Sequence, residues 1–215
     1  MDLSVVSVPM VVNLLVLMLI GMGPKIALVP FLEKTKHLEA HQQREVGVKM
    51  VKTAFITAIV LFACGALLMR LLHISGGAIS IAGGIILLIL ALGMFAGPGK
   101  KKEEGAEDEP TDINSMAVYP LAIPYLLNPV GIAVLIIASG EVGSIWAVLV
   151  VLAVIIVIAG FDYLIFSNID KLSKRLKPTT LVISEVVFGI LLIALAVEMV
   201  VAGLGRFGII EAVHH

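Results

Sequence analysis

Six apolar stretches follow one another along the chain and are separated by short polar segments. A helix needs about 20 predominantly apolar residues to cross the hydrocarbon core of a bilayer, and every stretch reaches that length. The pattern therefore predicts an all-α integral membrane protein with six transmembrane helices. Their expected positions are residues 4–32, 52–72, 75–97, 115–139, 144–167 and 181–204.

The fourth apolar stretch contains three prolines, Pro120, Pro124 and Pro129. Proline removes a backbone donor and clashes with the preceding turn, so an unbroken helix is not expected here. Asn128 followed by Pro129 is typical of a helix start, with an Asn cap and a Pro in the first turn. A break at membrane depth is tolerated only where the freed backbone faces protein or a water-filled cavity. We therefore expect a half-helix that begins inside the membrane.

The first apolar stretch is interrupted in the same way by Gly23-Pro24, and Pro24 lies 105 residues before Pro129. The same offset relates Gly84 to Gly189, within tracts that read GIILLILALGM and GILLIALAVEM. This shared register predicts an internal repeat. Matching interrupted segments in two halves are the usual sequence indication of a transporter's binding site.

A charged segment separates the two halves. Pro98–Asp112 reads PGKKKEEGAEDEPTD, and its mixed charges with Gly and Pro are typical of a disordered linker. The expected organisation is a first three-helix repeat at 1–97, a flexible cytoplasmic linker at 98–114 and a second three-helix repeat at 115–215.

Lysine and arginine residues indicate the orientation in the membrane. Twelve of them lie in the connectors at 33–52, 98–112 and 168–180, against only Arg70 and Arg206 on the opposite side. We therefore expect these connectors in the cytoplasm and both termini outside the plasma (inner) membrane. Three spans per half make the second half enter from the opposite face, so the repeat is expected to be inverted, with broken first and fourth helices.

Composition agrees with this class: 60% of the residues are hydrophobic and 14% charged, with a mean hydropathy of +1.10. In ordinary soluble domains about 45–50% of the residues are apolar and about 25% are charged. The net charge of −1 does not suggest a nucleic-acid partner. Cys64 is the only cysteine, which excludes an intramolecular disulfide and a thiolate-rich metal site. Without a nucleophile–base pair or an HExxH motif, no enzyme activity, metal or cofactor is expected, and a coupling ion, H⁺ or Na⁺, stays open.

Three tracts are similar to a known family: Ile79–Gly97, Tyr119–Leu135 and the segment around Gly23-Pro24. The chain resembles the MarC family, which includes the small neutral amino acid transporters called SnatA and is grouped with the LysE exporter superfamily. The resemblance covers both halves and implies movement of alanine, glycine or serine. At the breaks, Gly23 stands where the family has Asp, and Asn128 where it has Gly.

Half-helices that begin at Gly23 and Asn128 would present unpaired N–H groups and partial positive charge, which suit a carboxylate. Asn128 could accept a hydrogen bond from an ammonium group. We therefore expect a small zwitterion between the breaks, although glycines can equally serve close helix packing. The predicted substrate-binding residues are Gly23, Pro24, Lys25, Asn128, Pro129, Gly131, Gly83 and Gly84.

Charged groups inside the bilayer are costly and are candidates for function. Lys25, Asp162 and Glu185 share the cytoplasmic third of their spans. We expect Lys25 to pair with Asp162 or Glu185, and the alternative is that these side chains extend toward the headgroups. Glu198 lies near the outer end of the last span and is interpreted as interfacial.

The leading hypothesis is a multi-pass transporter or exporter of small neutral amino acids that works by alternating access. Its expected partners are the amino acid and the lipid bilayer, and a homo-oligomer stays open. The alternatives are an ion channel or ion transporter that uses intramembrane charges, and a membrane subunit of a larger complex. His214 and His215, at the end of the chain, are assigned no role.

A topology reporter tests the predicted orientation. Fused after Arg206 it should read as external, and inserted in the segment 100–112 it should read as cytoplasmic, because the positive charges stay inside. Reporter activity on the same side at both positions would require an even number of crossings and would contradict the inverted repeat.

Overall fold

The computed structural model describes residues 7–95, 112–169 and 178–209, and these segments are almost entirely helical. Most of the expected linker at 98–114 lies outside the described residues, as do His214 and His215. The elements in chain order are α1 (Val8–Met22), α2 (Pro24–Thr35), α3 (Ala40–Leu71), α4 (Gly76–Phe95), α5 (Ile113–Met116), η1 (Ala117–Leu126), α6 (Pro129–Glu141), α7 (Ile145–Ser167) and α9 (Pro178–Arg206).

The predicted spans are confirmed as helices long and apolar enough to cross a membrane. Five of them are continuous or broken only at Gly23, and the sixth is the pair formed by Ile113–Leu126 and Pro129–Glu141, which is bent by 72°. The described residues therefore form a helical multi-pass membrane protein, with breaks in the first and fourth spans as the sequence predicts.

One boundary differs from the prediction. The segment expected as a charged connector at 33–52 is mostly helical, because α2 continues to Thr35 and α3 begins at Ala40. A capping box starts α3: the Glu39 side chain accepts from the backbone at Gln42, and the Glu39 N–H donates to the Gln42 side chain at 3.0 Å. The first part of α3 carries charged residues and is suited to an exposed position, and its later part is apolar.

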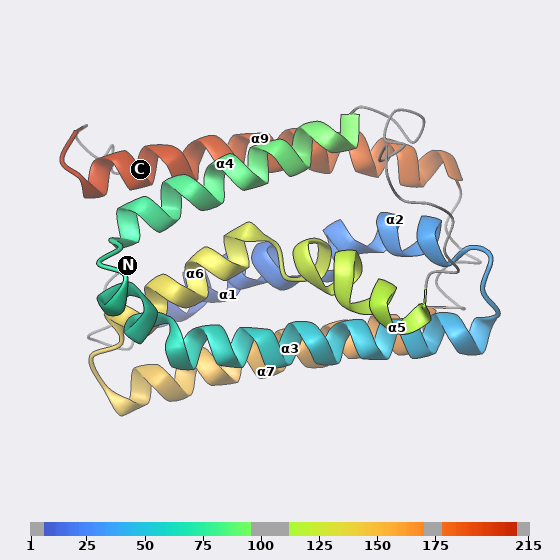
Figure 1. The fold of residues 1–215 in the computed structure, drawn as a ribbon, viewed down its shortest axis with the longest axis horizontal. Coiled ribbons are helices and arrows are strands. Elements are labelled where there is room, and N and C mark those ends of the chain that lie inside the picture. The colour runs from blue at the N-terminus through green and yellow to red at the C-terminus, as the bar shows by residue number, and fades with distance from the viewer. Residues whose placement is uncertain (1–6, 96–111, 170–177, 210–215) are drawn as a thin grey trace.

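The helices form three layers (Figure 1). The pair α4 and α9 makes one layer, α1, α2, η1 and α6 lie in the middle, and α3 and α7 make the other layer. Phe31 of α2 packs against Phe166 of α7, with ring centroids 5.1 Å apart. This contact belongs to the main apolar core, which joins the middle layer to α3 and α7.

Small residues bring α4 and α9 into close antiparallel contact. A Cβ atom on Gly77 would lie 3.0 Å from the Gly203 carbonyl oxygen, and one on Gly84 would lie 2.6 Å from the Ala196 carbonyl oxygen. Glycine allows two helix backbones to approach to this distance, a common device in membranes. α4 also packs on α6, so it links the outer pair to the middle layer.

Replacing glycines within α4 tests this packing. Gly84→Ala should lower the thermal stability of the detergent-purified protein, because the new methyl group meets backbone, and overpacking costs about 1–3 kcal/mol. Gly93→Ala on the same helix is the matched control: its Cβ would meet nothing within 4 Å, and alanine favours the helix by about 1 kcal/mol. Equal melting temperatures for the two variants would contradict the packing.

Candidate functional site

The two helix breaks meet in the middle layer, where Asn128 joins them. Its backbone N–H donates to the Gly21 carbonyl at 2.9 Å, and its side-chain Nδ2 donates to the Ile20 carbonyl at 2.7 Å. Its Oδ1 accepts from the N–H groups of Val130 at 2.9 Å and Gly131 at 3.3 Å. Asn128 is 0% exposed. One buried side chain therefore caps the start of α6 and satisfies the end of α1.

Local sequence explains why the chain breaks at these points. Gly23 and Asn128 are both extended, with ψ of 162° and 172°, and each is followed by a proline that begins the next helix. In η1, Tyr119 and Ile123 leave helical geometry directly before their prolines, where the helical conformation is disfavoured. The predicted break and the Asn cap are confirmed.

The backbones touch where the two breaks cross. Gly21 and Gly131 lie in direct contact, so that a Cβ atom on Gly131 would lie 2.8 Å from the Gly21 carbonyl carbon. The N–H groups of Val130 and Gly131 donate to Asn128 Oδ1, so these groups are occupied within the chain in this conformation. A zwitterion held between the breaks stays a prediction.

The other predicted site residues lie in three places. Gly83 and Gly84 pack helices: a Cβ atom on Gly83 would lie 2.8 Å from the Met199 methyl group and 3.3 Å from the Ala133 methyl group. Pro24 and Pro129 are buried at the starts of α2 and α6. Lys25 is exposed and lines a groove against α9.

The expected pair of Lys25 with Asp162 is absent from the structure. Both Asp162 oxygens are buried without a hydrogen-bond partner among the described residues. The reason is direction: Asp162 lies on the buried face of α7, in line with Ile158 and Phe166, whereas Lys25 lies on the side of α2 that faces α9. The Glu185 side chain lies outside the described residues, so the alternative pair stays a prediction.

The groove beside Lys25 runs between α1, α2 and α9 and has a volume of about 600 Å³. We call it the α9 groove. Among its described lining residues, Lys25 and Glu198 are charged and the others are apolar. From the sequence, Glu198 was interpreted as interfacial. It is a single acid in the apolar second half of α9, and this feature could have indicated a place in the groove. The described lining residues are Val16, Leu19, Ile20, Lys25, Ile26, Leu191, Leu192, Ala194, Leu195 and Glu198.

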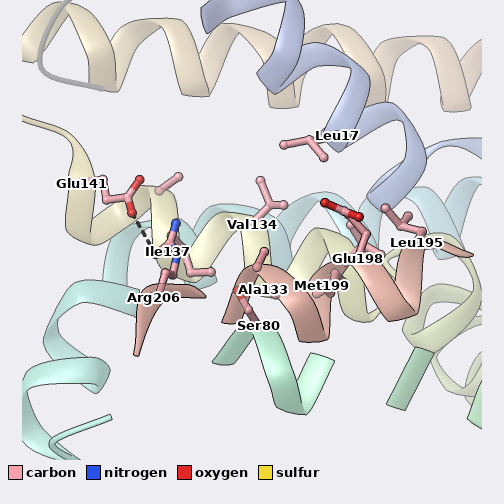
Figure 2. A pocket seen from close by; sticks show the side chains of 13 residues that line it. Leu17, Ser80, Ala133, Val134, Ile137, Glu141, Leu195, Glu198, Met199 and Arg206 are labelled. Carbon is pink, nitrogen blue, oxygen red and sulfur yellow. Dashed lines mark ion pairs between the residues drawn. The ribbon is translucent and has the colours of Figure 1, made fainter. Parts of the chain in front are cut away.

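A smaller cavity of about 180 Å³ adjoins the groove between α4, α6 and α9, and both are lined by Leu195 and Glu198. Figure 2 shows the Glu198 carboxylate directed away from α9 toward the side where Leu17 of α1 lies. An ion pair lies at the other end of this cavity, where Arg206 Nη1 is 3.0 Å from Glu141 Oε1 (Figure 2). The pair fastens the end of α9 to the end of α6.

These features define a multi-pass helical membrane protein with two broken spans that meet and a charged groove beside them. The chain belongs to the MarC family: it matches the MarC family integral membrane protein over residues 8–207. A UPF0056 membrane protein of Pyrococcus abyssi is 28% identical over 83% of this chain and 87% of its own length.

Two further relatives have the same general description. A UPF0056 membrane protein of Methanocaldococcus jannaschii is 29% identical over 77% of this chain and 83% of its own. The UPF0056 inner membrane protein YhgN of Escherichia coli is 24% identical over 90% of this chain and 95% of its own. These relatives are named as membrane proteins, without a catalytic activity. No solved structure matches the chain.

Substitution of Asn128 tests its role at the crossing. Asn128→Asp keeps an acceptor for the cap but loses the donor to Ile20 and adds a buried charge, whereas Asn128→Ala loses both hydrogen-bonding ends. Each should destabilise the protein by about 1–3 kcal/mol, since buried backbone groups lose their partners.

Asn168→Ala is the matched control. Asn168 also donates from Nδ2 to a backbone carbonyl, that of Leu164 at 2.9 Å, but it does so in an exposed position where water can replace it. Thermal unfolding in detergent measures the difference. A loss at position 128 no larger than that at position 168 would show that the crossing does not depend on Asn128.

Proposed function

We propose that this protein moves small neutral amino acids across the plasma membrane by alternating access between two inverted three-helix repeats. The observation that carries the proposal is the α9 groove, whose described lining residues include one positive and one negative side chain, Lys25 and Glu198, between apolar walls. Charged residues at membrane depth face the protein interior or water, and they mark substrate and ion pathways. Amino acids at neutral pH carry both charges, which matches Lys25 and Glu198.

The contacts between the halves support the repeat. A second buried cluster joins α2, α4, α6 and α9, and it contains Leu87 with Leu192 and Ala91 with Ala196. The members of each pair are 105 residues apart, the offset that relates Pro24 to Pro129. Helices related by a two-fold axis in the membrane would bring matching positions together at that axis.

The same offset supports a two-state cycle, because the corresponding contacts are unequal. Val130 of α6 packs with Leu87 of α4 in the second buried cluster. The corresponding residues of the other half, Lys25 and Leu192, instead line the open α9 groove. In the structure the α4–α6 contact is closed and the corresponding α9 groove beside α2 is open. If the two halves exchanged these arrangements, the groove would close and a corresponding groove would open between α4 and α6, as alternating access requires.

The size of the groove suits a small substrate. Ligand sites have volumes of about 300–1,000 Å³ and are lined mainly by apolar side chains with a few polar groups that fix orientation. The α9 groove, at about 600 Å³, falls within this range. In this arrangement Lys25 binds the carboxylate of the amino acid, Glu198 binds its ammonium group, and the apolar wall admits a short neutral side chain.

Counterflow of labelled alanine into proteoliposomes loaded with unlabelled alanine tests the proposal. Wild type should exchange alanine, and Lys25→Gln or Glu198→Gln should reduce exchange about tenfold or more, since hydrogen bonds to charged groups contribute about 1.5–3 kcal/mol. Lys34→Gln and Glu45→Gln are matched controls, because both residues are exposed and neither lines the groove. Both controls should exchange like wild type.

Competitors assign the two charges. Alaninamide lacks the carboxylate, so it should compete poorly against alanine in wild type. In Lys25→Gln the difference in affinity between alanine and alaninamide should be smaller, because the cation that distinguishes them is gone. Absence of alanine counterflow in wild type, or normal exchange by both groove variants, would overturn the proposed function.

A further inference from the structure

A fully buried carboxyl group lies outside the groove and is not used by the proposed substrate site. Asp162, on α7, is 0% exposed, and neither of its oxygens has a hydrogen-bond partner among the described residues. It continues the buried apolar face of α7 formed by Ile155, Ile158 and Phe166. A carboxyl group in such surroundings needs a physical explanation, because buried polar groups are normally paired.

Asp162 lies at a similar level along its helix to the break in the first span. Phe166, one helical turn further along α7, packs on Phe31 of α2. In Figure 1, α2 and α7 run in the same direction, so one turn back from this contact, about 6 Å, Asp162 lies near the level of buried Ala27. Ala27 is in the first turn of α2, directly after Gly23-Pro24. Asp162 therefore lies at about the level of the first turn of α2, which follows the break in the first span.

The described surroundings of Asp162 supply no compensating charge. The residues that α3 buries are apolar, among them Met50, Val51 and Ala54, and so are those that α1 buries, such as Met18 and Met22. None of the buried residues of α1, α2 or α3 has a titratable side chain. Lys49 of α3 hydrogen-bonds to Asn114, and Lys52 is exposed.

An ionised carboxylate in this environment would be strongly destabilising, because removing an isolated charge from water costs far more than one interaction returns. The side chain must therefore carry a proton or hold a cation. A metal cation or Na⁺ would need several oxygen ligands around it. Among the described residues, no three acidic, histidine or cysteine side chains gather in one place, and the Asp162 oxygens contact no other polar group.

We propose that Asp162 is the proton-carrying residue of the transport cycle, loaded with its proton in the conformation described here. The proposal rests on the proposed transport function. When the segment around Gly23-Pro24 rearranges and admits water, the O–H bond of the carboxyl group breaks, the proton passes to water and a carboxylate remains. Re-entry into the dry conformation requires a proton to be taken up again, so movement of the helices and movement of the proton become linked.

Infrared spectroscopy tests the resting state of Asp162 without any transport assay. Purified wild type at neutral pH should show the C=O band of a protonated carboxylic acid in a dry environment, and Asp162→Asn should lack it. Labelling aspartate with ¹³C at the side-chain carboxyl in wild type should shift the same band, which assigns it to aspartate even if the variant does not fold. Absence of the band in wild type would overturn the proposal.

Transport measurements test the coupling. In proteoliposomes, an imposed proton gradient should drive accumulation of alanine by wild type, and Asp162→Asn should lose at least nine-tenths of that accumulation. Asp162→Glu, which keeps a titratable group, should retain part of it. Asp112→Asn is the matched control, since Asp112 is exposed at the start of α5 and should accumulate alanine like wild type.

The two proposals fail in different ways. Wild type that shows the infrared band but no alanine exchange would contradict the amino acid substrate and leave the proton on Asp162 in place. Wild type that exchanges alanine and accumulates it under a Na⁺ gradient alone would contradict proton coupling, as would undiminished gradient-driven accumulation by Asp162→Asn.

Discussion

The arrangement depends on one constraint: peptide groups released from a helix inside a membrane need partners, because lipid offers none. Two spans are broken, at Gly23-Pro24 and at Asn128-Pro129, and hydrogen bonds between the two breaks satisfy part of the released peptide groups. Asn128 donates twice to carbonyl groups at the end of α1 and accepts from the start of α6. The Gly21–Gly131 contact makes this exchange possible, because any side chain at either position would separate the backbones.

The layers around this crossing are packed together to different extents. The middle layer is joined to α3 and α7 by the main apolar core, and a backbone hydrogen bond links its two breaks. The pair α4–α9 is joined mainly through α4 to α6, while α9 leaves a groove against α1 and α2. Two packed helices held on one side and separated on the other are suited to moving as a unit against the middle layer.

Sequence reasoning succeeded where the physics is local. Apolar length predicted the spans, and the prolines with Asn128 predicted the break and the cap, since these depend on a few neighbouring residues. It failed where the outcome depends on which helices meet. Asn128 was expected to face a ligand. Its hydrogen-bond partner is the Ile20 carbonyl, which lies 108 residues away in the chain, and local sequence does not show which distant residue meets it. Lys25 was expected to pair with Asp162 or Glu185 at similar depth, and the structure does not form the Asp162 pair, because depth does not specify the direction in which a side chain leaves its helix.

Four polar side chains at membrane depth therefore have three different environments. Asn128 is neutral and fully hydrogen-bonded, so its burial stabilises one arrangement of the breaks. Lys25 and Glu198 line a groove, where water or a charged ligand can reach them. Asp162 is fully buried and has no hydrogen-bond partner among the described residues, so its environment suits only the neutral form. A structural role accounts for Asn128. A chain selected for stability alone would have an apolar residue in place of Asp162, so Asp162 is the residue most in need of a functional explanation.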